Sequence, residues 1–286
     1  MAALLLDGKK LASEIQNELT QEVLGLKTRG IVPLLAVLMI EGDESSEVYV
    51  KNKVKRATEI GIQTIVEKVK ESEFDSLGMT IIKKWNEDEK IHGIIVQIPE
   101  KTNDTVNNIA QSVVPEKDVD CLSPYNIGLL EIGKAQYYPP TPAGIRALLS
   151  KNNISSEGKH VVIVSRSQLV GKALALMMLE KNEKGNATVT VCHSKTRNLA
   201  EFTSKADILI VAIGKPEFLS KEHIKENSVI VDVGINKTTK GLVGDFKHDE
   251  VESIVSAITP VPGGVGPMTV IMLLKNLVEA AKLKTK

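Results

Sequence analysis

Three polar residues occupy one face of a helix predicted to follow the first buried strand of the chain. Ser46, Tyr49 and Lys53 are spaced i, i+3 and i+7, and side chains at this spacing project from the same side of an α-helix. A lysine whose charged form is disfavoured by burial or by nearby cations can carry protons near neutral pH, and a tyrosine one turn away can stack on a planar substrate. The spacing therefore allows proton transfer to a planar molecule bound over this face.

Other polar residues stand where they can join this face. Gln97 lies near the end of the apolar run at 93–98, and the Lys-Asp-Val-Asp motif at 117–120 follows a predicted helix. Loops at the carboxyl ends of parallel strands meet at one edge, so these side chains can converge. In the alternative interpretation Lys53 belongs to the solvated basic face of its helix, the aspartates form turns, and Gln97 is a strand-end polar residue. Spacing alone does not decide between the two.

A second candidate site follows the strand predicted at 160–164. The turn from Ser165 to Gly171 leads into an apolar segment that is typical of a helix. The first turn of a helix offers unpaired N–H donors and the positive end of the helix dipole, so a dinucleotide pyrophosphate fits there. Ser165 and Ser167 stand where the fingerprint G-x-G-x-x-G has glycine, so the motif alone is weak support.

The residues at the end of the next predicted strand, 187–192, indicate whether NAD or NADP would bind. Residues 192–197, Cys-His-Ser-Lys-Thr-Arg, carry hydroxyls and cations where an acidic residue is expected for NAD, and Arg166 lies in the neighbouring turn. Cations beside the ribose favour a 2′-phosphate, so the pattern predicts NADP. A solvated basic loop without a ligand would show the same charge pattern.

The residues of both candidate sites lie on a chain in which predicted strands and helices alternate. The segments of strand length lie at 34–40, 62–68, 93–98, 160–164, 187–192, 207–213 and 228–235. Segments of helix length separate them, near 9–28, 45–59, 73–88, 104–113, 143–151 and 268–283. This order predicts an α/β fold with parallel sheets and right-handed crossovers.

A segment rich in proline, YYPPTPAG at 137–144, marks the expected boundary between two α/β lobes. We expect residues 1–139 to form a catalytic lobe and residues 140–269 a Rossmann-like dinucleotide-binding lobe, with a cleft between them. The final helix, residues 270–286, is expected to pack back on the first lobe.

The composition argues against several classes of protein. The chain has 286 residues with 36 basic and 36 acidic side chains, so no net charge attracts nucleic acid or an anionic membrane. Cys121 and Cys192 are far apart and form no C-x-x-C motif, which argues against a disulfide framework and a zinc site. No signal peptide and no membrane-spanning run is evident. We therefore expect a cytoplasmic protein without a metal.

The order of the two candidate sites bears on the class of dehydrogenase. The pattern Tyr-x-x-x-Lys also occurs in short-chain dehydrogenases, where it follows the nucleotide-binding turn, whereas Tyr49 and Lys53 precede that turn by more than 100 residues. A two-domain enzyme similar to shikimate dehydrogenase stays possible, since its substrate lobe also comes first.

Nearly the whole chain resembles one family in detail. The segments are DGKKLASEI, YVKNKVKRATEIGI, HGIIVQIP, PEKDVD, TPAGI, SRSQLVGKALALMML, ATVTVCHSKTRNL, ADILIVAIGKP, VIVDVGIN and ITPVPGGVGPMT. They are similar to bifunctional methylenetetrahydrofolate dehydrogenase/methenyltetrahydrofolate cyclohydrolase. The resemblance implies hydride transfer from the methylene bridge of the folate to NADP, then attack of water on the methenyl cation. It also implies tetrahydrofolate derivatives as partners, a homodimer, and a place in one-carbon metabolism and purine biosynthesis.

The resemblance assigns roles to residues of both lobes. It implies that Lys53 transfers the proton of the cyclohydrolase step and that the side-chain carbonyl oxygen of Gln97 holds the Lys53 amine. It also implies that Tyr49 stacks on the folate and that Asp120 forms a hydrogen bond with the pterin. It implies that the folate is also lined by Ser46, Pro262, Gly263 and Gly264. It implies that the dinucleotide is contacted by Thr141, Arg166, Ser167, Val170, Gly171, Ser194, Ile235 and Thr269.

Several positions depart from the family pattern. Ser165 replaces the usual glycine of the turn, Pro140 the usual cysteine before Thr141, and Ala173 a common proline, while Glu41–Glu44 rearranges a G-D-D-P loop. Serine at the turn is expected to hinder the approach of the pyrophosphate and so to lower the affinity for the cofactor. Two alternatives therefore stay open: a member with a single activity, such as cyclohydrolase only, and a non-catalytic dinucleotide-binding module.

Overall fold

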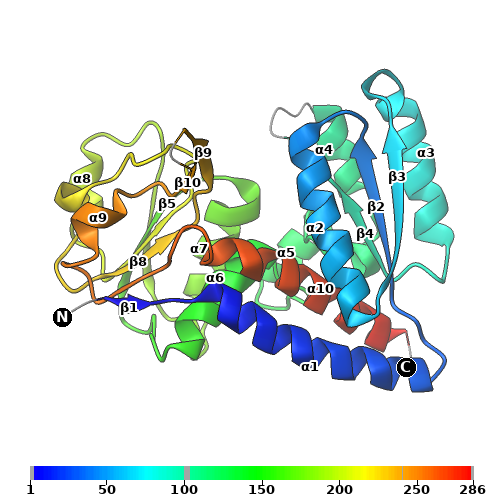
Figure 1. The fold of residues 1–286 in the computed structure, drawn as a ribbon, viewed down its shortest axis with the longest axis horizontal. Helices are drawn as coiled ribbons and strands as arrows, with labels where there is room; N and C mark the ends of the chain where they lie inside the picture. Colours follow the sequence, from blue (N-terminus) through cyan, green and yellow to red (C-terminus); the bar gives the residue numbers. More distant parts are fainter. Residues whose placement is uncertain (1–2, 100–103, 240, 285–286) are drawn as a thin grey trace. The chain divides into compact units, whose positions relative to one another are not determined.

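The computed structural model describes residues 3–99, 104–239 and 241–284, and the chain divides into two compact units. Unit 1 combines Met1–Ser13 with Thr141–Thr269, and unit 2 combines Glu14–Pro140 with Val270–Lys286. Both units alternate strands with helices (Figure 1). None of the helices in the described part of the chain combines the length and the apolar content needed to cross a bilayer.

Unit 1 is built on a six-stranded parallel sheet in the order β1-β11-β8-β7-β5-β6. Its strands are β1 (Leu4–Leu5), β5 (His160–Val164), β6 (Thr188–Cys192), β7 (Ile208–Val211), β8 (Val229–Asp232) and β11 (Ala257–Ile258). The central strands are apolar and buried, as expected for a sheet covered on both faces. The order around β5 matches the doubly wound dinucleotide-binding fold, in which the strand order reverses between the parallel neighbours β5 and β7.

Helices and a small hairpin complete unit 1. The helices are α6 (Pro140–Lys151), α7 (Ala173–Leu179), α8 (Leu199–Thr203) and α9 (His248–Val251). The antiparallel pair β9 (Asn236–Thr238) and β10 (Gly241–Val243) follows β8. The core beneath the sheet includes Leu209, Ile230, Phe246 and Val251, all of which are buried.

Unit 2 is built on a three-stranded parallel sheet in the order β3-β2-β4. Its strands are β2 (Leu34–Ile40), β3 (Gln63–Val69) and β4 (Gly93–Val96), and its helices are α2 (Glu44–Ile60), α3 (Phe74–Glu87), α4 (Asp104–Gln111) and α5 (Pro124–Glu131). The helices α2, α3 and α4 pack on the strands, and Phe74, Ile82, Ile94 and Ile109 fill the core between them. The sheet therefore aims the ends of β2 and β4 and the start of α2 at a common edge.

Two long helices are shared between the units. Helix α1 (Gly8–Thr28) begins in unit 1 and continues in unit 2, and α10 (Val265–Leu283) does the same near Thr269. The assignment of residues 1–139 to one lobe therefore differs from the structure in the first 13 residues. The reason is that β1 pairs with β11, where the Leu4 N–H donates to the Ser256 carbonyl oxygen at 2.9 Å.

The apolar runs located most strands and helices to within a few residues. The run at 34–40 coincides with β2, whereas the strands predicted at 207–213 and 228–235 are shorter and end at Val211 and Asp232. The two-residue strands β1 and β11 and the hairpin β9–β10 were not predicted. Such short segments carry too few residues for a pattern of period two to emerge.

Candidate active site

Lys53 and Gln97 come together in unit 2. Lys53 is buried on α2, and its Nζ donates a hydrogen bond to Gln97 Oε1 at 3.0 Å. Gln97 directly follows β4, and its backbone N–H donates to the Leu38 carbonyl oxygen at 2.8 Å, which fixes it to the central strand. This geometry confirms the predicted contact between the two side chains. Lys53 is therefore not part of a solvated basic face.

Ser46 and Tyr49 precede Lys53 on the same helix and have different environments. Ser46 is buried, and its hydroxyl donates to Asp43 Oδ2 at 2.5 Å. Tyr49 is 51% exposed, so its ring is available to stack on a flat ligand. Ser46 thus stabilises the start of α2, while Tyr49 offers an aromatic surface one turn from Lys53.

Asp120 presents a carboxylate near Lys53. Burial raises the pKa of Asp120, the positive charge of Lys53 partly offsets this effect, and the Asp118 carboxylate adds to it. Within the described residues no hydrogen bond to the Asp120 side chain is found. A half-buried carboxylate of this kind can accept hydrogen bonds from the N–H groups of a ligand.

The neighbours of Asp120 hold its loop in place. Lys117 is buried, and its Nζ donates to the backbone carbonyl oxygens of Trp85, Asn86 and Asp88 at the end of α3, at 2.7–2.8 Å. Asp118 accepts hydrogen bonds from the backbone N–H groups of the two residues that start the following turn. The turn-forming interpretation therefore applies to Asp118, and Lys117 anchors the loop rather than facing a ligand.

The turn after β5 has the expected strand, turn and helix order in unit 1. Ser167 is the N-cap of a short π-helical turn, Gln168–Lys172, and its hydroxyl accepts from the N–H groups of Val170 and Gly171 at 3.3 and 3.4 Å. The helix predicted after the turn is therefore preceded by this π-turn, and α7 begins only at Ala173. The N–H groups that a pyrophosphate would use therefore form long hydrogen bonds with the Ser167 hydroxyl, and a ligand can displace this hydroxyl.

Close packing explains the glycine of this turn. A Cβ at Gly171 would lie 2.1 Å from the Ser165 carbonyl oxygen, so a side chain is excluded there. Ser165 is buried and turns its hydroxyl toward Ser167, with 3.3 Å between the two Oγ atoms. Ser165 thus takes part in the turn instead of projecting from it, and the close approach of helix and strand is achieved with Gly171 alone.

The other predicted cofactor residues lie on the same unit. Arg166 and Ser194 are exposed in the loops that follow β5 and β6, and Ile235 is 43% exposed after β8. The hydroxyls of Thr141 and Thr269 are 2.9 Å apart and tie the start of α6 to α10. The carboxyl ends of parallel strands meet at one edge, which is where this fold binds a dinucleotide.

The segment Pro262–Gly264, predicted to line the folate, also lies in unit 1. The peptide bond before Pro262 is cis, and Gly263 has a φ of 113°, a conformation that favours glycine. The Gly263 carbonyl oxygen accepts from the Lys9 N–H at 2.8 Å, so the N-terminus of α1 holds this segment. The structure therefore distributes the predicted residues by unit: Ser46, Tyr49, Lys53, Gln97 and Asp120 in unit 2, and the others in unit 1.

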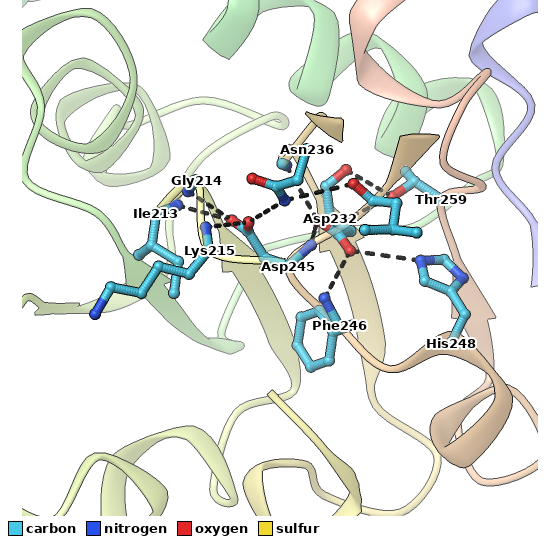
Figure 2. Close-up of polar contacts among 11 residues, drawn as sticks. Ile213, Gly214, Lys215, Asp232, Asn236, Asp245, Phe246, His248 and Thr259 are labelled. Carbon is cyan, nitrogen blue, oxygen red and sulfur yellow. Dashed lines mark hydrogen bonds and ion pairs between the residues drawn. The ribbon is translucent and has the colours of Figure 1, made fainter. Parts of the chain in front are cut away.

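Two buried aspartates were missed by the sequence analysis. Asp232 ends β8 and Asp245 follows β10, and both carboxylates accept several backbone N–H groups of unit 1, as Figure 2 shows. The available signal was an aspartate at the end of the apolar run VIVD, since a buried charge requires dedicated partners. Among the described residues no cluster of metal-ligating side chains is found.

Comparison with known proteins covers both units. Residues 6–120 match the catalytic domain of tetrahydrofolate dehydrogenase/cyclohydrolase, and residues 139–285 match its NAD(P)-binding domain. The chain is 44% identical over 282 residues to the bifunctional protein FolD of Halalkalibacterium halodurans, with 99% of this chain and 100% of the relative covered.

Two solved structures have the same fold over the whole chain. The bifunctional FolD of Campylobacter jejuni superposes with a TM-score of 0.94 at 41% identity, covering 99% of this chain and 100% of that one. The Trypanosoma brucei FolD, solved with NADP cofactor and an inhibitor, gives a TM-score of 0.91 at 32% identity, covering 100% and 99%. The chain therefore belongs to the tetrahydrofolate dehydrogenase/cyclohydrolase family.

Proposed function

We propose that this chain is an enzyme that oxidises 5,10-methylenetetrahydrofolate with NADP and hydrolyses the resulting 5,10-methenyltetrahydrofolate to 10-formyltetrahydrofolate. The observation that carries the proposal is the hydrogen bond from the buried Lys53 Nζ to Gln97 Oε1 within a matched catalytic domain. Relatives at 44% identity over the full chain that are named bifunctional support the same pair of activities.

The cyclohydrolase step requires proton transfers around a cationic carbon. Lys53 takes a proton from the attacking water and returns it to the leaving nitrogen of the folate, and the remaining hydroxyl proton passes to solvent as the formyl C=O forms. Gln97 holds the amine in the orientation that this transfer needs. Tyr49 stacks on the planar part of the substrate, and the Asp120 carboxylate accepts a hydrogen bond from the pterin. A fixed amine costs less reorganisation in the transition state than a mobile one.

The dehydrogenase step requires a hydride acceptor, and the oxidised nicotinamide of NADP is that acceptor. The donors of the turn Ser167–Gly171 hold the pyrophosphate once the Ser167 hydroxyl yields them, and Arg166 and Ser194 bind the 2′-phosphate. Thr141, Val170, Ile235 and Thr269 complete the contacts with the dinucleotide. Ser46 of unit 2 and Pro262, Gly263 and Gly264 of unit 1 are each proposed to contribute to folate binding.

The organisation of the enzyme in the cell is also part of the proposal. We propose a catalytic lobe and a Rossmann-like NADP-binding lobe, a homodimer, and a cytoplasmic enzyme of one-carbon metabolism that serves purine biosynthesis. The resemblance to the family supports each of these statements, and the domain matches at 6–120 and 139–285 support the division of labour between lobes.

A member with cyclohydrolase activity alone is the second candidate. The Ser167 hydroxyl already accepts hydrogen bonds from two N–H groups of the turn, so it competes with a pyrophosphate for these donors. In addition, Ser165 stands where glycine is expected. In that case Lys53 and Gln97 would function while NADP bound weakly.

One spectrophotometric assay separates these possibilities. The purified chain is given methylenetetrahydrofolate with NADP or NAD, and the absorbances of reduced nicotinamide and of the methenyl compound are followed separately. We expect reduction of NADP faster than that of NAD, with little methenyl compound accumulating. Hydrolysis of added methenyltetrahydrofolate without any reduction of a dinucleotide would establish the single-activity candidate, and the absence of both reactions would refute the proposal.

A further inference from the structure

The loop after β7 is held by a single buried carboxylate. Asp245 Oδ2 accepts the backbone N–H groups of Ile213 at 2.8 Å and Gly214 at 3.2 Å, and Oδ1 accepts that of Lys215 at 2.9 Å. The Asn236 side-chain amide donates to Oδ1 at 2.9 Å, as Figure 2 shows. Three successive N–H groups thus converge on one anion that is part of the protein.

Asp245 is itself aimed by a second buried carboxylate. Asp232 Oδ1 accepts the N–H groups of Gly234 and Asp245, both at 3.0 Å, and Oδ2 accepts that of Phe246 at 3.0 Å (Figure 2). A Cβ at Gly234 would lie 2.3 Å from the Asp245 carboxylate, and a Cβ at Gly244 would lie 1.9 Å from Asp232 Oδ2. The two carboxylates therefore leave no room for side chains at these two glycines.

The pairing of three N–H groups with Asp245 determines where the carbonyl oxygens point. In a trans peptide unit the N–H and the C=O are antiparallel, so the carbonyl oxygens of Ala212, Ile213 and Gly214 point away from Asp245. Within the described residues no donor reaches these three oxygens. The loop therefore presents acceptors without protein partners, a state that favours binding of a ligand with donor groups.

The topology indicates which part of a dinucleotide meets this loop. In a sheet with the order of β6, β5 and β7, the pyrophosphate crosses at the turn after β5, and the adenosine ribose lies at the tip of the strand on the β6 side. The nicotinamide half then lies over β7. Its donors are the amide NH₂ of the carboxamide and the ribose hydroxyls.

We infer that Asp245 is a positioning residue for the nicotinamide half of the cofactor: it holds the loop 212–215 so that the backbone carbonyl oxygens accept hydrogen bonds from the carboxamide and ribose. The inference rests on the proposed function, since it requires that the chain bind NADP. Asp245 does not touch the dinucleotide and acts through the loop.

The test compares NADP with its 3-acetylpyridine analogue, in which a methyl group replaces the amide NH₂, so that this donor is missing. For the wild-type chain and the Asp245→Asn variant, kcat/KM is measured with each cofactor, and the cofactor ratio is kcat/KM with NADP divided by kcat/KM with the analogue. We expect this cofactor ratio to fall about tenfold in the variant, which corresponds to the loss of roughly one hydrogen bond. The different redox potential of the analogue cancels when the two ratios are compared.

Hydrolysis of added methenyltetrahydrofolate without dinucleotide is measured on the same samples. This rate should be unchanged in Asp245→Asn, because Lys53 and Gln97 lie in unit 2. Asp249→Asn, a change of an exposed carboxylate on the neighbouring helix α9, is the matched control and should leave both measurements at the wild-type value. An unchanged cofactor ratio in Asp245→Asn would overturn the inference, even if both rates had fallen together.

A milder variant covers the case in which Asp245→Asn does not fold. Asn236→Ala removes one of the four hydrogen bonds to the Asp245 carboxylate, and a smaller fall in the cofactor ratio is expected. A wild-type ratio in this variant would then overturn the inference. Failure of the proposed function is visible separately, because the wild-type chain itself would then not reduce NADP.

Discussion

Lys53 Nζ lies 3.0 Å from Gln97 Oε1, a contact between residues 44 apart in the sequence that joins α2 to the end of β4. The amide oxygen is a neutral acceptor, so it orients the amine without adding a charge beside it. The amine can therefore exchange a proton with a ligand while staying in one position, and two predictions concern this pair.

Replacing Lys53 by Met should abolish the hydrolysis of methenyltetrahydrofolate. The variant keeps the length of the side chain but has no proton to transfer, and loss of such a group lowers rates by roughly 100-fold or more. The decay of methenyl absorbance measures the rate, and folate binding should stay measurable. Lys51→Met, on the exposed side of the same helix, is the control. Hydrolysis at the wild-type rate in Lys53→Met would remove Lys53 from the mechanism.

Replacing Gln97 by Glu should move the pH profile of hydrolysis. A carboxylate in place of the amide would pair with Lys53 Nζ and hold its ammonium form, so proton release would need a more alkaline solution than in the wild-type chain. The measurement is kcat for hydrolysis from about pH 6 to about pH 11.5, because an ordinary lysine amine titrates at about pH 10.4. A profile that only drops in height, without moving, would show that Gln97 acts on binding alone.

Replacing Arg166 by Ala should lower the preference for NADP over NAD. The exposed guanidinium is proposed to pair with the 2′-phosphate, and loss of such a charge-assisted bond costs about tenfold or more in kcat/KM with NADP. The rate with NAD should change little. Arg29→Ala, an exposed arginine of unit 2, serves as the control. Equal losses with both dinucleotides would argue against a 2′-phosphate contact.

His92 should make unit 2 less stable in acid. Burial, followed by the charges of Lys284 and Lys117, lowers the pKa of His92 to about 4. The unfolded chain, with an ordinary histidine pKa near 6.5, binds more protons than the folded chain between these values. The free energy of unfolding is therefore fully retained above about pH 6.5 and declines as the pH falls toward 4.

The variant His92→Gln should remove this part of the decline. Glutamine does not titrate, and its amide oxygen can still accept the hydrogen bond that His92 Nδ1 receives from the Leu34 N–H. Urea unfolding at several pH values compares the slopes of the two proteins. The same slope in both would mean that other groups cause the loss of stability in acid.

The sequence was informative where pattern and position coincide. The apolar runs of β2 and β5 predicted buried parallel strands, and the resemblance placed the acceptor of Lys53 at Gln97. It also placed a dinucleotide turn after β5. Each of these depends on residues that lie close in sequence or in a family motif.

The sequence was uninformative where a side chain forms hydrogen bonds with backbone groups that are distant in the sequence. Asp245 bonds the N–H groups of residues about thirty positions earlier, and such partners leave no residue type to recognise. Lys117 was expected to converge on the site with the rest of its motif, whereas its three partners are carbonyl oxygens at the end of α3. The π-turn at Gln168–Lys172 likewise depends on close packing at Gly171 rather than on local propensity.

The side chain that completes the Asp120 loop is encoded far downstream of it. Asn276 Nδ2 donates to the carbonyl oxygens of Val119 and Tyr138, at 2.9 and 2.8 Å, and a ribosome must translate all of residues 141–269 before it reaches this asparagine. A nascent chain arrested at Thr269 would carry Lys53, Gln97 and Asp120 yet lack this anchor. Hydrolysis should therefore first appear late in synthesis, once helix α10 has emerged and docked.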